Sequence, residues 1–434
     1  MEEAKHIVIV GGGFAGLKLA RKLNGHAAYR VTLIDRHNYH QFQPLFYQVA
    51  TASLEASSIS FPLRKIFQKS KNVRIRIAEL IRVDAERNMI RTTFGDIQYD
   101  YLVLATGADT NYFGNEHLKQ YAFPMKTTVE AMQLRNRIVE NLEAAACAKD
   151  EETLQRHLNI VVVGGGPTGV ELSGAISEMK QFILQKDYPE LDISKMHIYL
   201  LESSPNVLNA MSPSAKTKAR QYLTKMGVEV HTQTAVQDYD GKQALLKDGS
   251  TIPAALLIWA AGIRGNMPSG IAPDLIAPGN RVKVDAANKV LGSDNIFALG
   301  DIAFMENPDF PKGLPQLANV AIAEADHLAE NFKRAASGRP DFQPFNFKYQ
   351  GSMATVGRNK AVVDLNTPKI SFQGFFAWLV WMSVHLFLLM GFKNRLLVFI
   401  NWGYKYLTFD NSLRLIYTRP PYPIHEEEDA RTAV

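Results

Sequence analysis

Three glycines near the start of the chain are spaced as in a turn that binds phosphates. Gly11, Gly13 and Gly16 follow the apolar segment Ile7–Val10 and precede a segment with apolar residues at helical spacing. In such a turn the first glycine permits a tight bend, the second lets the backbone approach a pyrophosphate, and the third lets the helix pack on the strand. Asp35 ends the next apolar segment about 20 residues further on, where a carboxylate can bind a ribose hydroxyl. This segment therefore predicts a strand–turn–helix–strand unit that binds a dinucleotide.

The same pattern occurs a second time. Gly164, Gly166 and Gly169 follow another apolar segment, and Glu202 ends the next one. The spacing to Glu202 is longer than usual, which predicts that QKDYPELDISKM is an insertion between the helix and the strand. One such glycine set can be a purely structural turn. Two sets, each followed by an acid at the end of the next strand, favour two dinucleotide sites.

Three further apolar segments end in residues that suit a nucleotide site. They end in Thr106-Gly107, in Ala261-Gly262 and in Gly300-Asp301. An acid at the carboxyl end of a parallel strand lies next to a bound dinucleotide, although Asp301 could instead cap a helix.

The order of these motifs predicts an α/β fold with two Rossmann-like domains. The 434 residues suggest about three domains at roughly 150 residues each. We expect an FAD domain made of residues 1–112 and 276–340, interrupted by an NADH domain at 113–275. Residues 341–434 form a third region of different composition, predicted to be helical and to associate with a membrane.

Composition excludes several other classes of protein. The 48 Lys+Arg nearly balance the 43 Asp+Glu, and a net charge of +5 is too small at this length to indicate nucleic-acid binding. Cys147 is the single cysteine, so a disulfide framework, a cysteine-rich metal site and a CxxC redox pair are all excluded. No two histidines are spaced for a metal on an expected helix, and we predict no metal site.

Three longer segments resemble one family of flavoproteins. They are DRHNYHQFQPLFYQVATASLEASSISFPLRKIF at 35–67, GSMATVGRNKAVVDL at 351–365, and GFFAWLVWMSVHLFLLMGFKNRLLVFINWGYKY at 374–406. Together with the two glycine sets, they are similar to the type II NADH dehydrogenases, which are single-subunit NADH:quinone oxidoreductases. These enzymes belong to the flavoprotein superfamily with two dinucleotide-binding domains, and the resemblance spans almost the whole chain.

The resemblance implies a respiratory-chain enzyme with non-covalent FAD. Hydride would pass from NADH to the flavin, and two electrons would then pass to a membrane quinone without proton pumping. Two alternatives share both nucleotide sites: a soluble reductase for a ferredoxin or rubredoxin, and an NADH-sensing flavoprotein with no enzymatic role. The predicted cofactor-binding residues are Gly11, Gly13, Phe14, Ala15, Gly16, Asp35, Arg36, Gln43, Leu80, Thr106, Gly107, Asp301, Gly164, Gly166, Thr168, Gly169, Glu202, Ala261 and Gly262.

Glu171 is the predicted catalytic residue. The family places this carboxylate near the nicotinamide and flavin, whereas the alternative is an acid that only complements the helix dipole. Glu202 would bind the adenosine ribose and repel the 2′-phosphate of NADPH, so NADH is the expected nucleotide. His37, His40 and His385 lie in family-like segments and are either acids or hydrogen-bonded structural residues.

The quinone side is defined less directly by the sequence. The family commonly has Ala-Gln-x-Ala-x-Gln after the strand that ends at Asp301, where this chain has the segment ANVAIA beginning at Ala318. Asn319 stands where the family has the first Gln, and its side-chain amide is shorter. In another alignment register Gln316 would take this position and supply the longer amide. The predicted quinone-side residues are Gln48, Gln316, Ala318 and Asn319.

The segment 372–391 contains no charged residue and is long enough to cross a membrane. The resemblance instead implies a pair of interfacial helices on the cytoplasmic side of the inner membrane; a spanning helix and a buried core or dimer helix are the alternatives. The partners are thus a lipid surface, a quinone and a second subunit in a homodimer. Rings and cations expected at the headgroups are Trp378, Trp381, Trp402, Tyr404, Tyr406, Lys393, Arg395 and Lys405.

Overall fold

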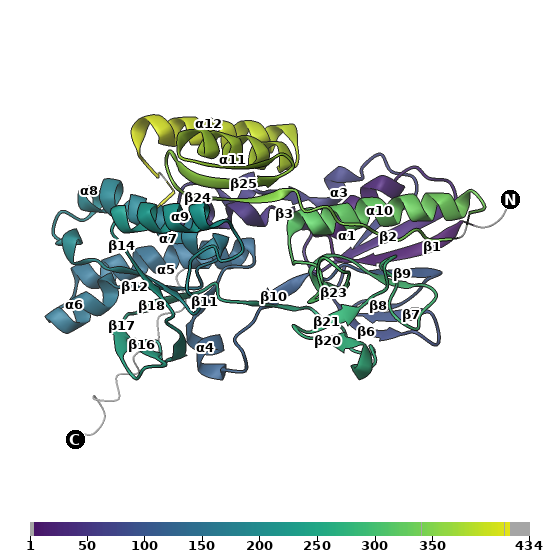
Figure 1. Cartoon of the computed structure of the whole chain (residues 1–434), viewed down its shortest axis with the longest axis horizontal. Coiled ribbons are helices and arrows are strands. Elements are labelled where there is room, and N and C mark those ends of the chain that lie inside the picture. Colours follow the sequence, from purple (N-terminus) through teal and green to yellow (C-terminus); the bar gives the residue numbers. More distant parts are fainter. Residues whose placement is uncertain (1–3, 340, 412, 417–434) are drawn as a thin grey trace, which may run out of the picture.

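The computed structural model describes residues 4–339, 341–411 and 413–416. Two α/β lobes lie side by side, and the helices α11 and α12 lie together along one face, above the strands β24 and β25 (Figure 1). The tail after Arg419, expected from its composition to be disordered, lies outside the described residues.

The first lobe is built on a parallel sheet of five strands. The buried residues of its strands are almost all apolar and pack against α1 and α10 on one side and smaller sheets on the other, as a parallel sheet covered on both faces requires. In sheet order the strands are β22 Ile296–Ala298, β9 Tyr101–Leu104, β1 Lys5–Val10, β2 Tyr29–Asp35 and β5 Val73–Ile77.

The second lobe repeats this architecture. Its sheet also has parallel pairing throughout, and the strands have the same apolar character. In sheet order the strands are β11 Phe123–Pro124, β18 Leu256–Trp259, β12 Ile160–Val163, β13 Ile198–Glu202 and β14 Val228–Thr232.

The chain passes between the lobes twice. The strands β10 (Ala108–Thr110) and β19 (Ile263–Gly265) pair antiparallel at this crossing. Because β22 returns to the first sheet after the second lobe is complete, the first domain is interrupted by the second, as the order of the motifs predicts. The domain boundaries themselves stay predictions.

Smaller sheets and twelve α-helices complete the described part of the chain. The remaining strands are β3 Tyr39–Gln41, β4 Ser60–Pro62, β6 Leu80–Asp84, β7 Met89–Thr92, β8 Gly95–Gln98, β15 Val236–Tyr239, β16 Gln243–Leu246, β17 Thr251–Pro253, β20 Ile276–Ala277, β21 Arg281–Lys283, β23 Ala303–Phe304, β24 Gly351–Gly357, β25 Lys360–Asn366 and β26 Lys369–Gln373. The helices are α1 Phe14–Leu23, α2 Phe46–Ala50, α3 Leu63–Ile66, α4 Glu116–Tyr121, α5 Thr128–Ala146, α6 Glu151–Leu158, α7 Pro167–Met179, α8 Gln185–Asp187, α9 Pro213–Lys225, α10 Ala318–Ala336, α11 Phe375–Leu388 and α12 Phe392–Thr408.

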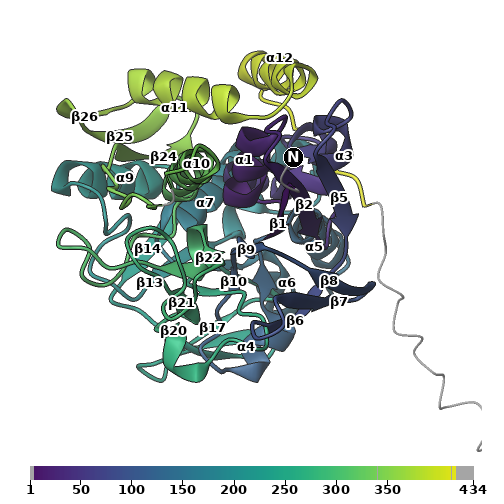
Figure 2. The same cartoon turned by 90° about the vertical axis from the view of Figure 1, so that its right-hand side faces the viewer.

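The C-terminal region shares its core with the second lobe. The strand β24 packs directly on α7, so closely that any side chain at Gly174 would strike the carbonyl of Val356. Trp381 and Trp402 of the two C-terminal helices belong to the same hydrophobic cluster as the α7 residue Ile176. Both views show α11 and α12 stacked on this side of the molecule (Figures 1 and 2). The region is therefore an integral layer rather than a detachable anchor.

Candidate active site

The glycine turn between β1 and α1 leaves room for a phosphate. Gly11 has φ +113°, and a side chain there would collide with the carbonyl of Ala105. A side chain at Gly16 would collide with the carbonyl of Gly11, so the helix packs tightly on the turn. Beside Gly13, in contrast, no atom lies within 4 Å of where a Cβ would stand. The second turn repeats this pattern, with open space beside Gly166.

The two strand-end acids are held in the same way. Asp35 accepts hydrogen bonds from the N–H groups of Gly12 (2.5 Å) and His37 (2.6 Å). Glu202 accepts hydrogen bonds from the N–H groups of Gly165 (2.5 Å) and Ser204 (2.6 Å). Each carboxylate is thus fixed at the mouth of its turn with lone pairs left for a ribose. The residues present fit one dinucleotide in each lobe.

The other predicted cofactor residues lie around these two turns. In the first lobe, Phe14 and Ala15 begin α1, Arg36 follows β2, Thr106 and Gly107 follow β9, and Asp301 lies in the short 3₁₀ turn after β22. Burial raises the pKa of Asp301, an effect opposed by Lys126 and Arg281. Gln43 begins a 3₁₀ turn before α2, and Leu80 begins β6. In the second lobe, Thr168 and Gly169 lie in the first turn of α7, while Ala261 and Gly262 follow β18. Their contacts with a nucleotide stay predictions.

Glu171 is buried on α7, beneath the C-terminal strands. Its Oε1 accepts a hydrogen bond from the N–H of Thr355 on β24 at 3.3 Å. Burial raises the pKa of Glu171 to about 8, although the contacts with Thr355 and Trp381 oppose the shift. An acid that only complemented the helix dipole would have a lowered pKa. At neutral pH this carboxyl group is therefore largely protonated.

A cavity of about 80 Å³ lies against Glu171, between α7, α2 and the C-terminal helices. Tyr47, Gln48 and Trp402 line it and form a hydrogen-bonded chain. The indole Nε1 of Trp402 donates to Gln48 Oε1 (2.7 Å), and Gln48 Nε2 donates to the Tyr47 hydroxyl (2.8 Å). Because the indole can only donate, this chain fixes the orientation of the Gln48 amide. The Tyr47 proton must then find another acceptor, and the cavity lies next to it.

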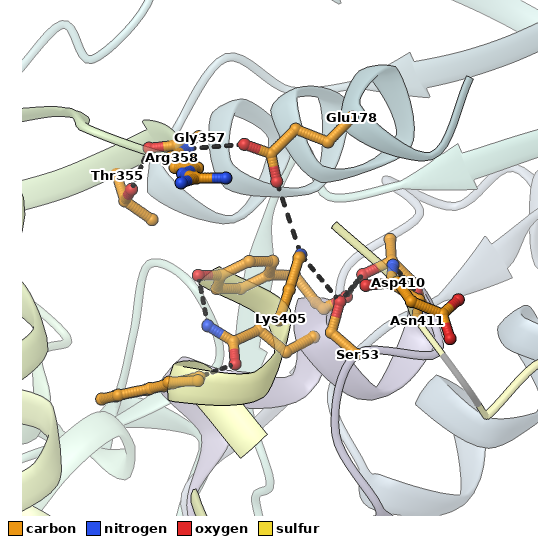
Figure 3. Close-up of polar contacts among 12 residues, drawn as sticks. Ser53, Glu178, Thr355, Gly357, Arg358, Lys405, Asp410 and Asn411 are labelled. Atoms are coloured by element: carbon orange, nitrogen blue, oxygen red, sulfur yellow. Dashed lines mark hydrogen bonds and ion pairs between the residues drawn. The ribbon is translucent and has the colours of Figure 1, made fainter. Parts of the chain in front are cut away.

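The other side of the cavity is charged. Lys405 of α12 lies 3.4 Å from Glu178 Oε2 and donates to Ser53 Oγ at 3.0 Å (Figure 3). Glu178 Oε1 also accepts from the N–H of Arg358 at 2.5 Å. The Arg358 guanidinium lies between two aromatic rings of the C-terminal region, 3.9 Å and 4.0 Å from their centroids. Lys405 thus points into the protein, and the expectation that it faces lipid headgroups is wrong.

The predicted quinone-side residues do not all meet. Gln48 lines the cavity with Glu171, but the other three lie at the start of α10 in the first lobe. There Gln316 donates to the carbonyl of Asp301 at 2.8 Å, and Asn319 accepts from the N–H of Val320 at 2.9 Å. Ala318 begins the helix beside them, and none of the three lines the cavity.

Several cavity residues were not identified from the sequence. Tyr47 lies next to Gln48, while Glu178 lies two turns after Glu171 on the same face of α7, a spacing that could have signalled it. Arg358 comes from the turn of the β24–β25 hairpin, within the family-like segment 351–365, but the segment alone does not show which helix the hairpin covers. These side chains meet only because the hairpin β24–β25 covers α7.

The structure corrects the expectation for two tryptophans and favours the structural alternative for two histidines. Trp381 and Trp402 are buried in the shared core instead of lying at a membrane surface. His40 bonds the carbonyl of Gly12 (3.0 Å) and His385 bonds that of Trp381 (2.7 Å), as structural histidines do. Burial lowers the pKa of His385 to about 4, so this residue is neutral.

The helices α11 and α12 form an apolar pair at the surface. The helix α11 contains only 14 residues of the segment 372–391 and is about 21 Å long. It is this short because Phe372 belongs to β26 and the helix ends before Leu389. Among the residues that the structure describes, no helix has the length and apolar character needed to cross a membrane, so the alternative of a spanning helix at 372–391 is wrong. The large apolar side chains exposed on the pair include Phe376, Leu379, Phe387, Leu388, Phe392, Phe399, Ile400 and Leu407.

Comparison with known families agrees with this fold. Residues 5–325 match the pyridine nucleotide-disulphide oxidoreductase family, and residues 349–408 match the NDH2 C-terminal domain. The chain is therefore a flavoprotein of the class with two dinucleotide-binding domains. Its single cysteine means that it cannot use a cysteine pair within the chain.

Similar proteins identify the branch of this class. The type II NADH:quinone oxidoreductase NdhA of Mycobacterium tuberculosis is 36% identical over 421 residues, covering 92% of this chain and 87% of the relative. A second enzyme of that organism, Ndh, is 34% identical over 420 residues, covering 93% and 88%. The structure of NDH2 from Plasmodium falciparum in complex with NADH has a TM-score of 0.86 at 22% identity and covers 96% of this chain and all of that one. The chain belongs to the type II NADH:quinone oxidoreductases: it is an FAD-dependent enzyme that transfers electrons from NADH to a quinone, and neither alternative function is favoured.

Proposed function

We propose that the quinone ring binds in the cavity beside Glu171 and that this residue supplies a proton during reduction. The observation that carries the proposal is the convergence of Glu171, Tyr47 and Gln48 on one cavity. Reducing a quinone to a quinol takes two electrons and two protons. FAD, which the first glycine turn would hold, would supply both electrons and one hydrogen, taken from NADH as a hydride, so that the protein needs to supply only the second proton.

The side chains have separate roles in this proposal. The protonated Oε of Glu171 donates to one quinone oxygen, which its pKa of about 8 permits at neutral pH. Burial keeps the pKa of Tyr47 well above its usual value, so its hydroxyl stays protonated and orients the ring by a hydrogen bond. Gln48, fixed by Trp402, holds the Tyr47 hydroxyl in place.

The ring needs more space than the cavity offers. Its volume of about 80 Å³ is below the roughly 150 Å³ of an engineered cavity that accepts benzene. Binding therefore requires part of the lining to move. We propose that Arg358 moves, because its guanidinium is held in the lining by contacts with two rings and its buried Nη1 makes no hydrogen bond among the described residues.

Tyr47→Phe tests the assignment. We expect stopped-flow reduction of the flavin by NADH to be unchanged, and reoxidation by a short-chain quinone to slow about tenfold, the value of one lost hydrogen bond of about 1.4 kcal/mol. Tyr239→Phe is the matched control, because this buried tyrosine of β15 lies in the second lobe and its hydroxyl donates to the carbonyl of Ala254, outside the cavity. Normal reoxidation in Tyr47→Phe would place the quinone elsewhere.

We also propose that the exposed face of α11 and α12 lies on a membrane surface. The support is a row of large apolar side chains on two adjacent helices, where a lipid quinone could reach the cavity without leaving the bilayer. Phe376 is 74% exposed on this face, and Phe94, at 84%, lies on a β-turn of the first lobe. Phe376→Ser should weaken binding to phosphatidylcholine liposomes at least tenfold, whereas Phe94→Ser should not. Equal binding of both variants would contradict this orientation.

The cytoplasmic side of the inner membrane and a homodimer complete the proposal. Oxidation of added NADH by inside-out vesicles, but not by right-side-out vesicles, tests the side. Light scattering of the purified enzyme tests the dimer.

A further inference from the structure

A second cavity lies at the opposite end of the C-terminal helix pair, against the first lobe. It has a volume of about 510 Å³ and lies between the end of α1, the helix α3 and the turn that joins α11 to α12. Figure 2 shows α3 and α12 close together beside α1. This cavity shares no residue with the one that contains Glu171.

The walls of this cavity combine cations with neutral side chains. Arg21 and Lys65 supply two positive charges, and Asn24 and Gln68 supply amides. No Asp or Glu lines it, and no ion pair within the described residues neutralises either cation. The Lys65 ammonium lies over the Phe61 ring, 5.7 Å from its centre, which is a cation–π contact.

The cavity is also continuous with the apolar helix pair. Its remaining wall contains Met390 and Gly391 from the α11–α12 turn. A side chain at Gly391 would strike the Phe61 ring, so this turn is packed tightly against the segment before α3. Phe387 and Phe392 flank the turn and are among the most exposed apolar side chains of the described chain. Positive charge and exposed apolar surface therefore lie next to each other at the edge of this cavity.

We infer that this cavity binds the headgroup of an anionic phospholipid from the membrane on which the enzyme lies. The phosphodiester would contact Arg21 and Lys65, the amides would bind glycerol oxygens, and the acyl chains would run along Phe392 into the bilayer. A free phosphate would satisfy the cations but would leave the apolar wall unused. The inference rests on the proposed orientation of α11 and α12, and it gives the enzyme a fixed point of attachment at the end of the helix pair away from the quinone cavity.

A soluble lipid tests the cavity without a membrane. Dihexanoyl phosphatidylglycerol, below its critical micelle concentration, should bind the FAD-loaded enzyme in calorimetry, whereas dihexanoyl phosphatidylcholine and inorganic phosphate should bind at least tenfold more weakly. The double variant Arg21→Gln/Lys65→Gln should lose about 30-fold in affinity, since each cation near an anionic lipid contributes about 5-fold. Equal binding of inorganic phosphate, or unchanged affinity in the variant, would overturn the inference.

A control variant separates this site from general basic charge. Arg64→Gln/Lys69→Gln removes the same net charge from neighbouring exposed positions outside the cavity and should retain phosphatidylglycerol binding. Both variants should keep their FAD and their rate of NADH:ferricyanide turnover. If the double variant loses FAD, the single variant Lys65→Gln carries the test, with an expected loss of about 5-fold.

Liposomes distinguish this inference from the proposed orientation. If α11 and α12 lie on the membrane but the cavity does not bind lipid, the enzyme will bind phosphatidylcholine liposomes and the Arg21/Lys65 variant will bind phosphatidylglycerol liposomes as well as the wild type does. If the orientation is wrong, Phe376→Ser will have no effect on liposome binding, while the soluble phosphatidylglycerol can still bind.

Discussion

The two glycine turns begin helices that occupy equivalent places in the two lobes, yet the residue two positions after the third glycine differs. In the first lobe this residue is Lys18, which lies at the surface and pairs with Asp326 of α10 at 3.1 Å. In the second lobe it is Glu171, which is buried and contacts the backbone of Thr355 at 3.3 Å. The same position on the same fold thus carries a solvated cation in one lobe and a largely protonated acid in the other.

The difference comes from what covers each helix. The helix α1 is covered by α10, whose charged side chains reach solvent beside it. The helix α7 is covered by β24, and the burial of Glu171 beneath this strand raises its pKa. A nucleotide unit that only holds its cofactor needs no such cover, whereas the unit with β24 acquires an acid that can take part in chemistry.

Valine at the second glycine of each turn should produce the largest contrast between the lobes. Gly13→Val would fill the space beside the first turn, and we expect the purified protein to be colourless. Gly166→Val would fill the second turn, and we expect a yellow protein that NADH reduces very slowly but dithionite reduces normally. Flavin absorbance and stopped-flow reduction measure both effects. A yellow Gly13→Val protein would show that FAD does not bind at the first turn.

Neutralising Glu171 should give the next largest effect, whereas neutralising its counterpart Lys18 should give none. Glu171→Gln removes the proton donor, and we expect quinone reduction to slow about 100-fold, within the range of general acid catalysis, while FAD content is unchanged. Lys18→Gln is the matched control and should leave both half-reactions unchanged, because its ion pair is partly exposed. Stopped-flow traces of flavin reduction and reoxidation separate the two half-reactions. If both half-reactions of Glu171→Gln are normal, the buried acid has only a structural role.

Neutralising the acids that end β2 and β13 should have a smaller effect, and the property that changes should differ between the lobes. Glu202→Gln removes the charge that repels a 2′-phosphate, and we expect the preference for NADH over NADPH in kcat/KM to fall about tenfold. Asp35→Asn, in the first lobe, should leave this preference unchanged and weaken FAD retention instead. Unaltered discrimination in Glu202→Gln would mean that this carboxylate does not face the ribose.

The smallest effect should appear in the pH dependence of stability. Glu171 has an ordinary pKa of 4.5 when unfolded and about 8 when folded, so the folded state binds this proton more tightly. Its stabilising contribution is complete below pH 4.5 and is lost as the pH rises through about 8. Only the wild type loses this contribution as the pH rises. The thermal midpoint of Glu171→Gln minus that of the wild type should therefore increase by a few °C from pH 5 to pH 9. A constant difference across this range would contradict the raised pKa.

The nucleotide turns were predictable from the sequence because each is a local structure. Gly11, Gly13, Gly16 and Asp35 act within one strand–turn–helix–strand unit, and their spacing alone defines the geometry. The cavity beside Glu171 could not be predicted in this way, since Tyr47, Arg358 and Lys405 come from distant segments and meet only in the tertiary structure. Lys405 illustrates this limit. The sequence shows that a lysine lies on an apolar helix, but it does not show that its side of α12 faces Glu178 and not solvent.

The position of β22 has a consequence for synthesis on the ribosome. The second sheet is complete once residue Trp259 has been made, but the first sheet must wait for Ile296–Ala298 to supply its edge strand. The inserted lobe can thus fold inside a domain that is still unfinished. The hairpin β24–β25 and the helices α11 and α12 emerge after both sheets and close the shared core. The apolar face proposed to contact lipid is consequently made only after the two sheets on which it rests, which shortens the time during which it can cause aggregation.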